Sequence, residues 1–435
     1  MLRALVLVLL ALTPSALAQQ VWTVSPTTPG ADFLDVQTAV EAATDGDLIL
    51  VGAHSSYDDF IVNGKGLTIV ASPGALVQIR GASVRGLGPE QRVVLSNLQF
   101  EGGFEAGLSI KNSAGSVWIQ DCALRGARGN GLYALGADQH QEGHPGLELQ
   151  NAGTVSVVRS VLTGGEGDSY SLASSPGAGG AGLAAIGTAA VTVQDSVLRG
   201  GRGGNIDDDD TAWTGPPGGP GLLFGDAEVT LMDVNLVGGA GGIGGEDFDP
   251  FFGYSCGSGG RGGAGIEETF LNQGGVVHMA NVTITPGAGG PAYTGASCQS
   301  GPPGALYDLI AGTVVGFDAG VFTAAIAQPV VEGGLLQVDV AGPVNSIGFI
   351  AVGAGPAQLP LSGWAGNLLV DPAKLFIQSA GSLPSTLQLT APQVMTPGGA
   401  RGFYAQVGGF DFATNALTLS QPIWAGVLDA GVLIP

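Results

Sequence analysis

Apolar and polar residues alternate in a pattern that recurs through the middle of the chain. The stretches VTVQDSVL, from Val191, and VTLMDVNL, from Val229, share an alternating run, an aspartate and a closing aliphatic residue. A period of two over so few residues predicts a half-buried strand and excludes an amphipathic helix. Stretches of this form begin at Val93, Val117, Val155, Val191, Val229 and Val277.

A second short strand is predicted before most of these stretches. It begins at a glycine, as in GLEL from Gly146 and GLLF from Gly221. Two such strands are too short to bury their own apolar face, so their repetition favours a solenoid with like residues stacked about 4.8 Å apart. The remaining residues of the longer repeats are glycine-rich and are predicted as loops, without the Gly-x-y period of collagen.

An Asn or Asp column follows the alternating run of most repeats. These short side chains bond nearby backbone groups and suit a position where a strand turns a corner. We therefore interpret the column as structural and not catalytic, although Arg159 interrupts it. Its members are Asn97, Asp121, Asp195, Asp233 and Asn281.

The segment 32–51 predicts a short helix followed by a strand. Val36, Ala39, Val40 and Ala43 share one face of this helix, which would cover the open edge of the first repeat. The repeats and this segment resemble the right-handed parallel β-helix of the pectin-lyase-like superfamily. The resemblance implies a fold more than an activity, because the superfamily includes lyases, hydrolases, esterases and adhesins.

The last quarter of the chain has a different pattern. Short alternating runs such as LLQVDV, IGFIAV and STLQLT are separated by Gly, Pro and Ser turns, which predicts a small antiparallel sandwich. It looks like the C-terminal β-domain of exported repeat proteins, which would cap the last repeat or serve attachment or export. We therefore expect an all-β protein, with a right-handed parallel β-helix over residues 19–315 and a β-sandwich-like domain over residues 316–435.

Residues 1–18 have the pattern of a signal peptide. Arg3 gives a positive start, ALVLVLLAL is apolar, and the small residues ALA end at Ala18. No later run approaches the roughly 18 apolar residues of a membrane span. We expect a protein that is secreted or displayed on the extracellular surface, with the periplasm as the alternative, and that is a monomer.

The net charge of the chain limits the classes of molecule that we expect it to bind. The chain carries 14 Lys and Arg against 36 Asp and Glu, a net charge of -22. Nucleic acids and anionic membranes need basic residues to neutralise them, so both are excluded as expected partners. An extracellular polysaccharide or a cation remains as an expected binding partner.

Catalytic motifs of the superfamily are incomplete here. The Gly-His-Gly and Arg-x-Lys segments of polygalacturonase-like hydrolases are absent. QDSVL, from Gln194, resembles a segment of pectin methylesterases, but the second aspartate of that family falls on Gly221. We therefore expect no cleavage or de-esterification of pectin, and we predict a secreted or cell-surface binding or structural module for glycans. The alternative is a polysaccharide lyase, hydrolase or esterase.

Arginines occupy repeated positions in the aligned repeats. Arg128, Glu166 and Arg202 share one column, and Arg125 and Arg199 share a neighbouring column. One interpretation is a cleft for a polyanionic sugar. The other, which we favour, is a ladder of ion pairs on the surface.

Acidic and aromatic residues follow the glycines of three successive repeats. If the repeats stack in register, they would gather on one rim, where carboxylates suit calcium and aromatic rings suit sugar faces. The alternative is that solvated acids only keep these loops soluble. The candidate residues are Glu166, Asp168, Asp207, Asp208, Asp209, Asp210, Trp213, Glu246, Asp247 and Asp249.

The cysteines divide into a pair and a single thiol. Cys256 and Cys298 lie in glycine-rich segments of neighbouring repeats, so stacking would bring them together, and export would favour a disulfide. Cys122 occupies a column of apolar and small residues, which predicts a buried free thiol.

Overall fold

The described part of the protein is nearly all β-structure. In this computed structural model, α2 (Val36–Ala42) is the one helix among the described residues, and it is too short to cross a membrane. The predicted signal peptide lies outside the described residues. The structure describes residues 19–103, 105–129, 142–169, 176–206, 214–249, 253–292, 298–316, 323–326, 330–331, 335–343, 346–353, 356–360, 364–365, 367–370, 376–390, 399–411 and 416–428.

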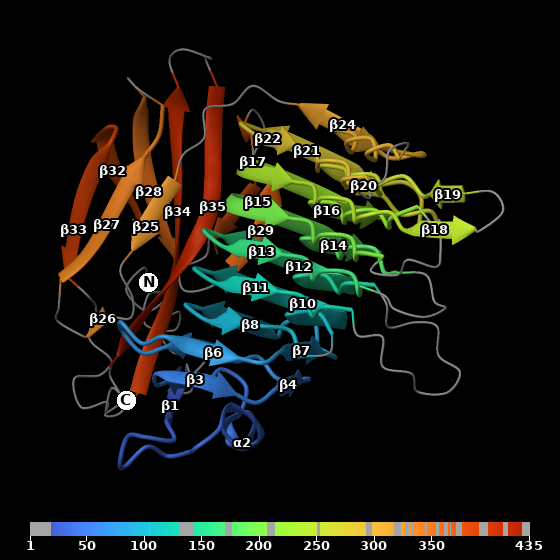
Figure 1. Ribbon diagram of the computed structural model, residues 1–435. Helices are drawn as coiled ribbons and strands as arrows, with labels where there is room; N and C mark the ends of the chain where they lie inside the picture. Colours follow the sequence, from blue (N-terminus) through green and yellow to red (C-terminus); the bar gives the residue numbers. More distant parts are fainter. Residues whose placement is uncertain are drawn as a thin grey trace, which may run out of the picture.

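Parallel strands pair in three columns that form one long, curled sheet (Figure 1). The first column contains β1 (Gln19–Val24), β2 (Leu48–Val51), β5 (Thr68–Ala71), β8 (Arg92–Ser96), the second halves of β10 (Leu108–Gln120) and β12 (Leu147–Val158), the first halves of β15 (Ala190–Arg199) and β17 (Glu228–Val237), β21 (Val276–Ala280) and β24 (Thr313–Gly316).

The other two columns flank the first along the chain. The second contains β3 (His54–Tyr57), β6 (Val77–Ile79), β9 (Gln99–Phe100), β11 (Ala123–Arg125), β13 (Val161–Thr163), the second halves of β15 and β17, and β22 (Thr283–Thr285). The third contains β4 (Phe60–Asn63), β7 (Ala82–Arg85), the first halves of β10 and β12, β14 (Leu183–Ile186), β16 (Leu222–Gly225), β20 (Ile266–Glu268) and β23 (Tyr307–Asp308).

The apolar positions of the alternating runs form the core inside these columns. Val157, Val193 and Leu231 are paired in register on neighbouring strands, and all three are fully buried. Each such aliphatic side chain contributes about 1.5–3 kcal/mol by leaving water. The alternation of apolar and polar residues therefore determines where the strands form and which of their side chains face the core.

The Asn and Asp column turns a corner, as the sequence predicts. Its five members have φ between 49° and 58°, in the left-handed region that these residues tolerate. Arg159 interrupts the column but has the same conformation, with φ 46°. Its guanidinium donates to both carboxylate oxygens of Asp121 at 2.8 Å, so the neighbouring acid holds it in place.

The lower end of the columns in Figure 1 is covered by α2. Asp35 caps the helix by accepting from the Thr38 N–H, and Val36, Ala39 and Val40 are buried. The helix contacts β1, β2 and β4, the first strands of the stack. This arrangement removes an open strand edge from solvent.

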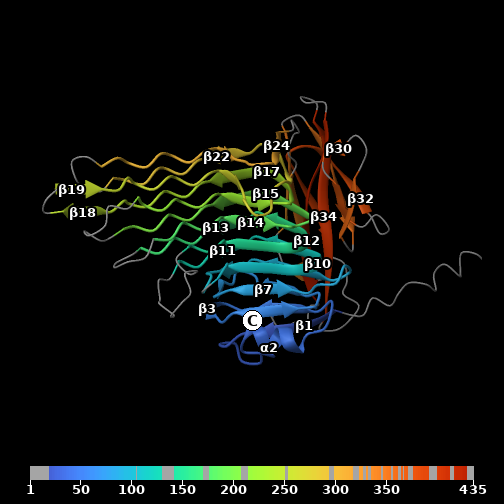
Figure 2. The same ribbon diagram turned by 90° about the vertical axis from the view of Figure 1, so that its right-hand side faces the viewer.

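The glycine-rich segments contain little helix or strand over their described lengths, but their backbone hydrogen bonds follow a regular pattern. The outgoing arms follow β11, β13, β15, β17 and β22, and the return arms precede β12, β14, β16, β20 and β23. Figure 2 shows them projecting from one side of the columns as extended, stacked segments. Arms of successive repeats bond at every third residue: Gly200 and Gly203 of one outgoing arm donate to carbonyls of the next. This is the three-residue period of polyproline II, which apolar periodicity does not reveal.

A ladder of hydrogen bonds joins the outgoing and return arms. The N–H of Gly201 donates to the carbonyl of Gly180, and the carbonyl of Gly201 accepts from Gly219, both at 2.8 Å or less. The backbones lie so close that a Cβ on Gly201 would come within 1.8 Å of the Gly165 oxygen. Glycine is therefore required by close approach. The ladder runs through Gly165, Gly180, Gly201, Gly219, Gly239, Gly263, Gly287 and Gly304.

The last part of the chain forms small antiparallel sheets along the flank of the columns, not over their upper end (Figure 1). Val158 of β12 packs in one apolar cluster with Val338, Ile350 and Val407. The strands are β25 (Thr323–Ile326), β26 (Val330–Val331), β27 (Leu335–Ala341), β28 (Ile347–Gly353), β29 (Pro356–Pro360), β30 (Trp364–Ala365), β31 (Asn367–Val370), β32 (Phe376–Ser382), β33 (Ser385–Thr390), β34 (Gly399–Asp411) and β35 (Ala416–Leu428).

Candidate functional site

The predicted acidic rim is only partly within the described residues. Glu166 is exposed on an outgoing arm and Asp168 is half-buried two residues further on. Glu246, Asp247 and Asp249 belong to β18 (Glu246–Asp249), which pairs with β19 (Gly253–Cys256) in a hairpin at the far end of the arms (Figure 2). The predicted members that lie outside the described residues are Asp207, Asp208, Asp209, Asp210 and Trp213.

The calcium hypothesis stays a prediction. Within the described residues, no three His, Cys, Asp or Glu side chains gather closely enough to hold a metal ion. The carboxylates of β18 and of 207–210 are the groups on which binding would depend. Calorimetry with millimolar calcium tests them, and zero heat of binding would remove the hypothesis.

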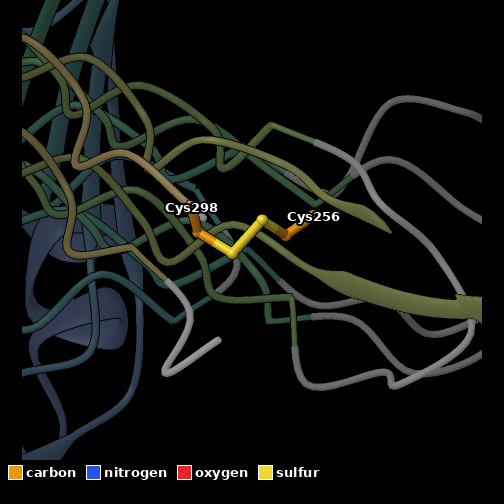
Figure 3. Close-up of a disulfide and its surroundings, with 2 residues drawn as sticks. All are labelled: Cys256 and Cys298. Carbon is orange, nitrogen blue, oxygen red and sulfur yellow. A yellow bond between two sulfur atoms is a disulfide. The ribbon is translucent and has the colours of Figure 1, made fainter. Parts of the chain in front are cut away.

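A disulfide ties the far ends of two return arms together (Figure 3). It joins Cys256, at the end of the β18–β19 hairpin, to Cys298 of the next repeat, with the Cα atoms 5.6 Å apart. Cys122 is a buried free thiol, and burial raises its pKa to about 12. This thiol is consequently protonated at neutral pH and has a packing role.

The repeated arginines are exposed. Arg128 and Arg202 lie on outgoing arms, whereas Arg125 and Arg199 are the last residues of β11 and β15. Register is as the alignment predicts, because Gly129 donates to the Glu166 carbonyl and Gly167 to the Arg202 carbonyl. The predicted ion-pair ladder does not form among these described residues. Arg128 instead donates to Ser169, and Arg202 to Asn205 of its own arm.

A long hollow crosses the repeats at a second corner of the columns. This corner groove has a volume of about 1130 Å³ and extends from the repeat of Gly86 to that of His278. Asn112, Asn151 and Asp226 turn the corner with φ near 50°, and the Asn151 amide donates to the Asn112 side chain at 3.3 Å. The polar side chains along it are those of Asn112, Ser113, Asn151, Thr188, Asp226, Glu228 and His278.

A smaller hollow of about 650 Å³, the arm groove, lies over the return arms. Glycine and proline backbones line most of it, and Arg261, Glu267 and Asp308 stand beside them. Glu267 and Asp308 are neighbours across β20 and β23, and Arg261 donates to Asp308. Burial raises the pKa of Glu267, with a further contribution from the charge of Asp308. A carboxyl group with a raised pKa beside a second carboxylate in a hollow is a candidate for general acid–base chemistry.

Sequence reasoning missed the residues of both grooves. The second corner has Asn112, Asn151 and Asp226 but Gly187 in the repeat between the last two, so no single residue type marks it. Glu267 and Asp308 lie within strands, as GIEE and LYDL, and only stacking makes them neighbours. Comparisons with known protein families, curated proteins and solved structures found no match.

Proposed function

We propose that the chain is a secreted or cell-surface binding module, built as a right-handed parallel β-helix of the pectin-lyase-like kind, that holds an extended glycan. The three columns of parallel strands support the β-helix part of this proposal. The corner groove carries the binding part, because a hollow that crosses successive repeats fits a polymer better than a compact small molecule.

The chemistry of the corner groove favours a neutral glycan. Its amides and hydroxyls can donate to and accept from sugar hydroxyls. Its charged groups are the acids Asp226 and Glu228, and His278 lies 4.0 Å from Glu228. An anionic polymer would meet these carboxylates and be repelled, so the expected ligand carries hydroxyl groups and few charges.

Removal of the groove amides tests this proposal. The double substitution Asn112→Gly and Asn151→Gly keeps residues that tolerate the left-handed conformation, as Gly187 does in the same column. We expect affinity for neutral polysaccharides to fall about thirtyfold, since the two lost hydrogen bonds are worth about 1 kcal/mol each. Affinity electrophoresis and calorimetry on a panel of neutral and acidic chains measure it.

Asn281→Gly is the matched control. Asn281 has the same left-handed conformation, with φ 51°, but it lies at the other corner, outside the groove. This variant should bind as the unchanged protein does. Retention of no polysaccharide in the panel, or equal binding by all three proteins, would contradict the proposal.

A polysaccharide hydrolase is the second candidate, favoured by the carboxyl pair of the arm groove. Glu267 could protonate the leaving oxygen of a glycosidic bond while the second carboxylate assists water or the developing cation. Reducing ends released from the same panel would be measured. Glu267→Gln should abolish release, whereas Glu148→Gln should not, because Glu148 occupies the same outward column but pairs with Lys111 at 2.9 Å.

A further inference from the structure

Exposed apolar side chains concentrate at the upper end of the columns. Of the twelve large apolar residues that are exposed in the described part of the chain, six belong to this end. Leu271 is 87% exposed and Phe270 76%. Apolar surface of this kind, gathered in one place, marks a site of association. The six residues, which define the upper end, are Phe270, Leu271, Leu306, Tyr307, Ile310 and Val315.

The strands of the upper end also have unpaired edges. β23 pairs with β20 and β24 with β21, and among the described strands neither has a partner on its other side. The core residues beneath, Leu309 and Val314, are only partly buried. Backbone donors and acceptors thus lie beside apolar side chains, the arrangement that accepts another strand.

The two ends of the stack differ in this respect. At the lower end, α2 covers the first strands and buries its own apolar face on them. Among the described residues, the antiparallel sheets pack on the flank, through Val158 and β35. A head-to-tail stack of copies is therefore blocked by the helix, whereas two upper ends remain free to meet.

Charge distinguishes the upper end from most of the surface. Residues 299–316 contain one charged residue, Asp308, and Arg261 already neutralises it. The loop 269–275 between β20 and β21 contains none. In a chain with a net charge of -22, this nearly neutral surface is a place where two copies can approach without strong repulsion.

We propose that the upper end is the interface of a closed two-fold dimer of this chain. A two-fold axis normal to the first column reverses the strand direction, so that β24 pairs with its symmetry mate in antiparallel fashion. The same operation brings the apolar side chains of the two upper ends together, and the helix-covered lower ends point outward. The sequence alone favours a monomer, and the exposed end revises that expectation.

Analytical ultracentrifugation of the chain without residues 1–18, at concentrations from about 1 to about 100 µM, tests the proposal. We expect a dimer that dissociates on dilution. Val315→Asp, which is 44% exposed on edge strand β24, should yield a monomer with unchanged circular dichroism. Val161→Asp, 42% exposed on the inner strand β13, is the matched control and should remain a dimer.

Two further measurements distinguish loss of the interface from loss of the fold. Leu271→Asp changes a side chain with almost no buried contact, so it should weaken the dimer at least tenfold even if Val315→Asp fails to fold. Amides of β23 and β24 should exchange hydrogen more slowly at high concentration than at low. A monomer throughout the range, or a dimer in which these amides stay unprotected, would overturn the proposal.

Discussion

The parallel columns and the glycine-rich arms fill space in opposite ways. In the columns, Val193 and Leu231 are fully buried and their side chains make the core. In the arms, the buried positions Gly201 and Gly203 carry no side chain, and the backbones of neighbouring arms touch directly. One region is held by apolar surface removed from water, and the other by hydrogen bonds between peptide groups.

This difference determines what each region tolerates. Side chains can change rotamer around a substituted neighbour, so an apolar core accepts residues of similar volume. Peptide groups in a bonded lattice cannot move singly, because each arm bonds to the arms above, below and beside it. We therefore expect the arms to be the less tolerant region, although glycines occupy most of their buried positions among the described residues.

The largest effect is expected for Gly201→Val. A Cβ at this position would meet the Gly165 oxygen at 1.8 Å and the Gly165 carbonyl carbon at 2.6 Å, both backbone atoms. The free energy of unfolding should fall by more than about 3 kcal/mol, and protection of the arm amides from hydrogen exchange should be lost. Chemical denaturation and mass-resolved hydrogen exchange measure the two effects.

Arg202→Val is its control in the same arm. Arg202 is exposed at the third position of the Gly-Gly-x period, whereas the glycines on both sides are buried. The change should alter stability by less than about 0.5 kcal/mol. Equal damage from both substitutions would mean that the arms are not held by close backbone approach.

The columns could be predicted from sequence because their signal is apolar periodicity. Val191 and Val229 begin runs that the structure pairs residue by residue, and Asp195 and Asp233 turn the expected corner. The regular hydrogen bonding of the arms could not be predicted in this way, since apolar periodicity gives no signal where the buried residues are glycines. The signal of the arms is a period of three, present in runs such as GGAGGIGG from Gly238.

The grooves could not be predicted because they depend on stacking. Glu267 and Asp308 are far apart in sequence and become neighbours only through the register of β20 and β23. Asn112 and Asn151 could not be recognised as a column, because Gly187 has the left-handed conformation at the same corner in the next repeat. Alignment of the repeats finds columns of one residue type. A site assembled from different residue types can be identified only when the register of the stacked strands is known.

The apolar columns are tested next by Leu231→Ala and Leu231→Met. Leu231 is fully buried, so truncation to alanine leaves a cavity and should cost about 3 kcal/mol of unfolding free energy. Methionine has a similar volume and should cost less than about 1.5 kcal/mol. If methionine proved as damaging as alanine in denaturant titrations, the columns would resemble the arms in tolerance, and the contrast would fail.

The smallest effect is expected at the corner after β20. This corner is held by an ionised side chain, and not by apolar burial or by hydrogen bonds between peptide groups alone. Burial opposes ionisation of Glu268, but backbone N–H groups of Gly274, Ile310, Ala311 and Gly312 donate to its carboxylate and lower its pKa to about 2. A folded pKa below the usual value of 4.5 stabilises the protein above pH 4.5, and that stability is lost as pH falls toward 2.

We expect about 2 kcal/mol to be lost over this range, because hydrogen bonds to a charged group are worth roughly that amount. Amides 310–312 should lose protection as pH falls, while Gly287 and Gly304 keep theirs, since their partners are uncharged peptide carbonyls. Glu268→Gln should remove this part of the pH dependence in urea titrations between pH 2 and 7. If Glu268→Gln kept the full dependence of unfolding free energy on pH, another carboxylate would be responsible. If the arm and corner amides lost protection at the same pH, the corner would not open independently of the arms.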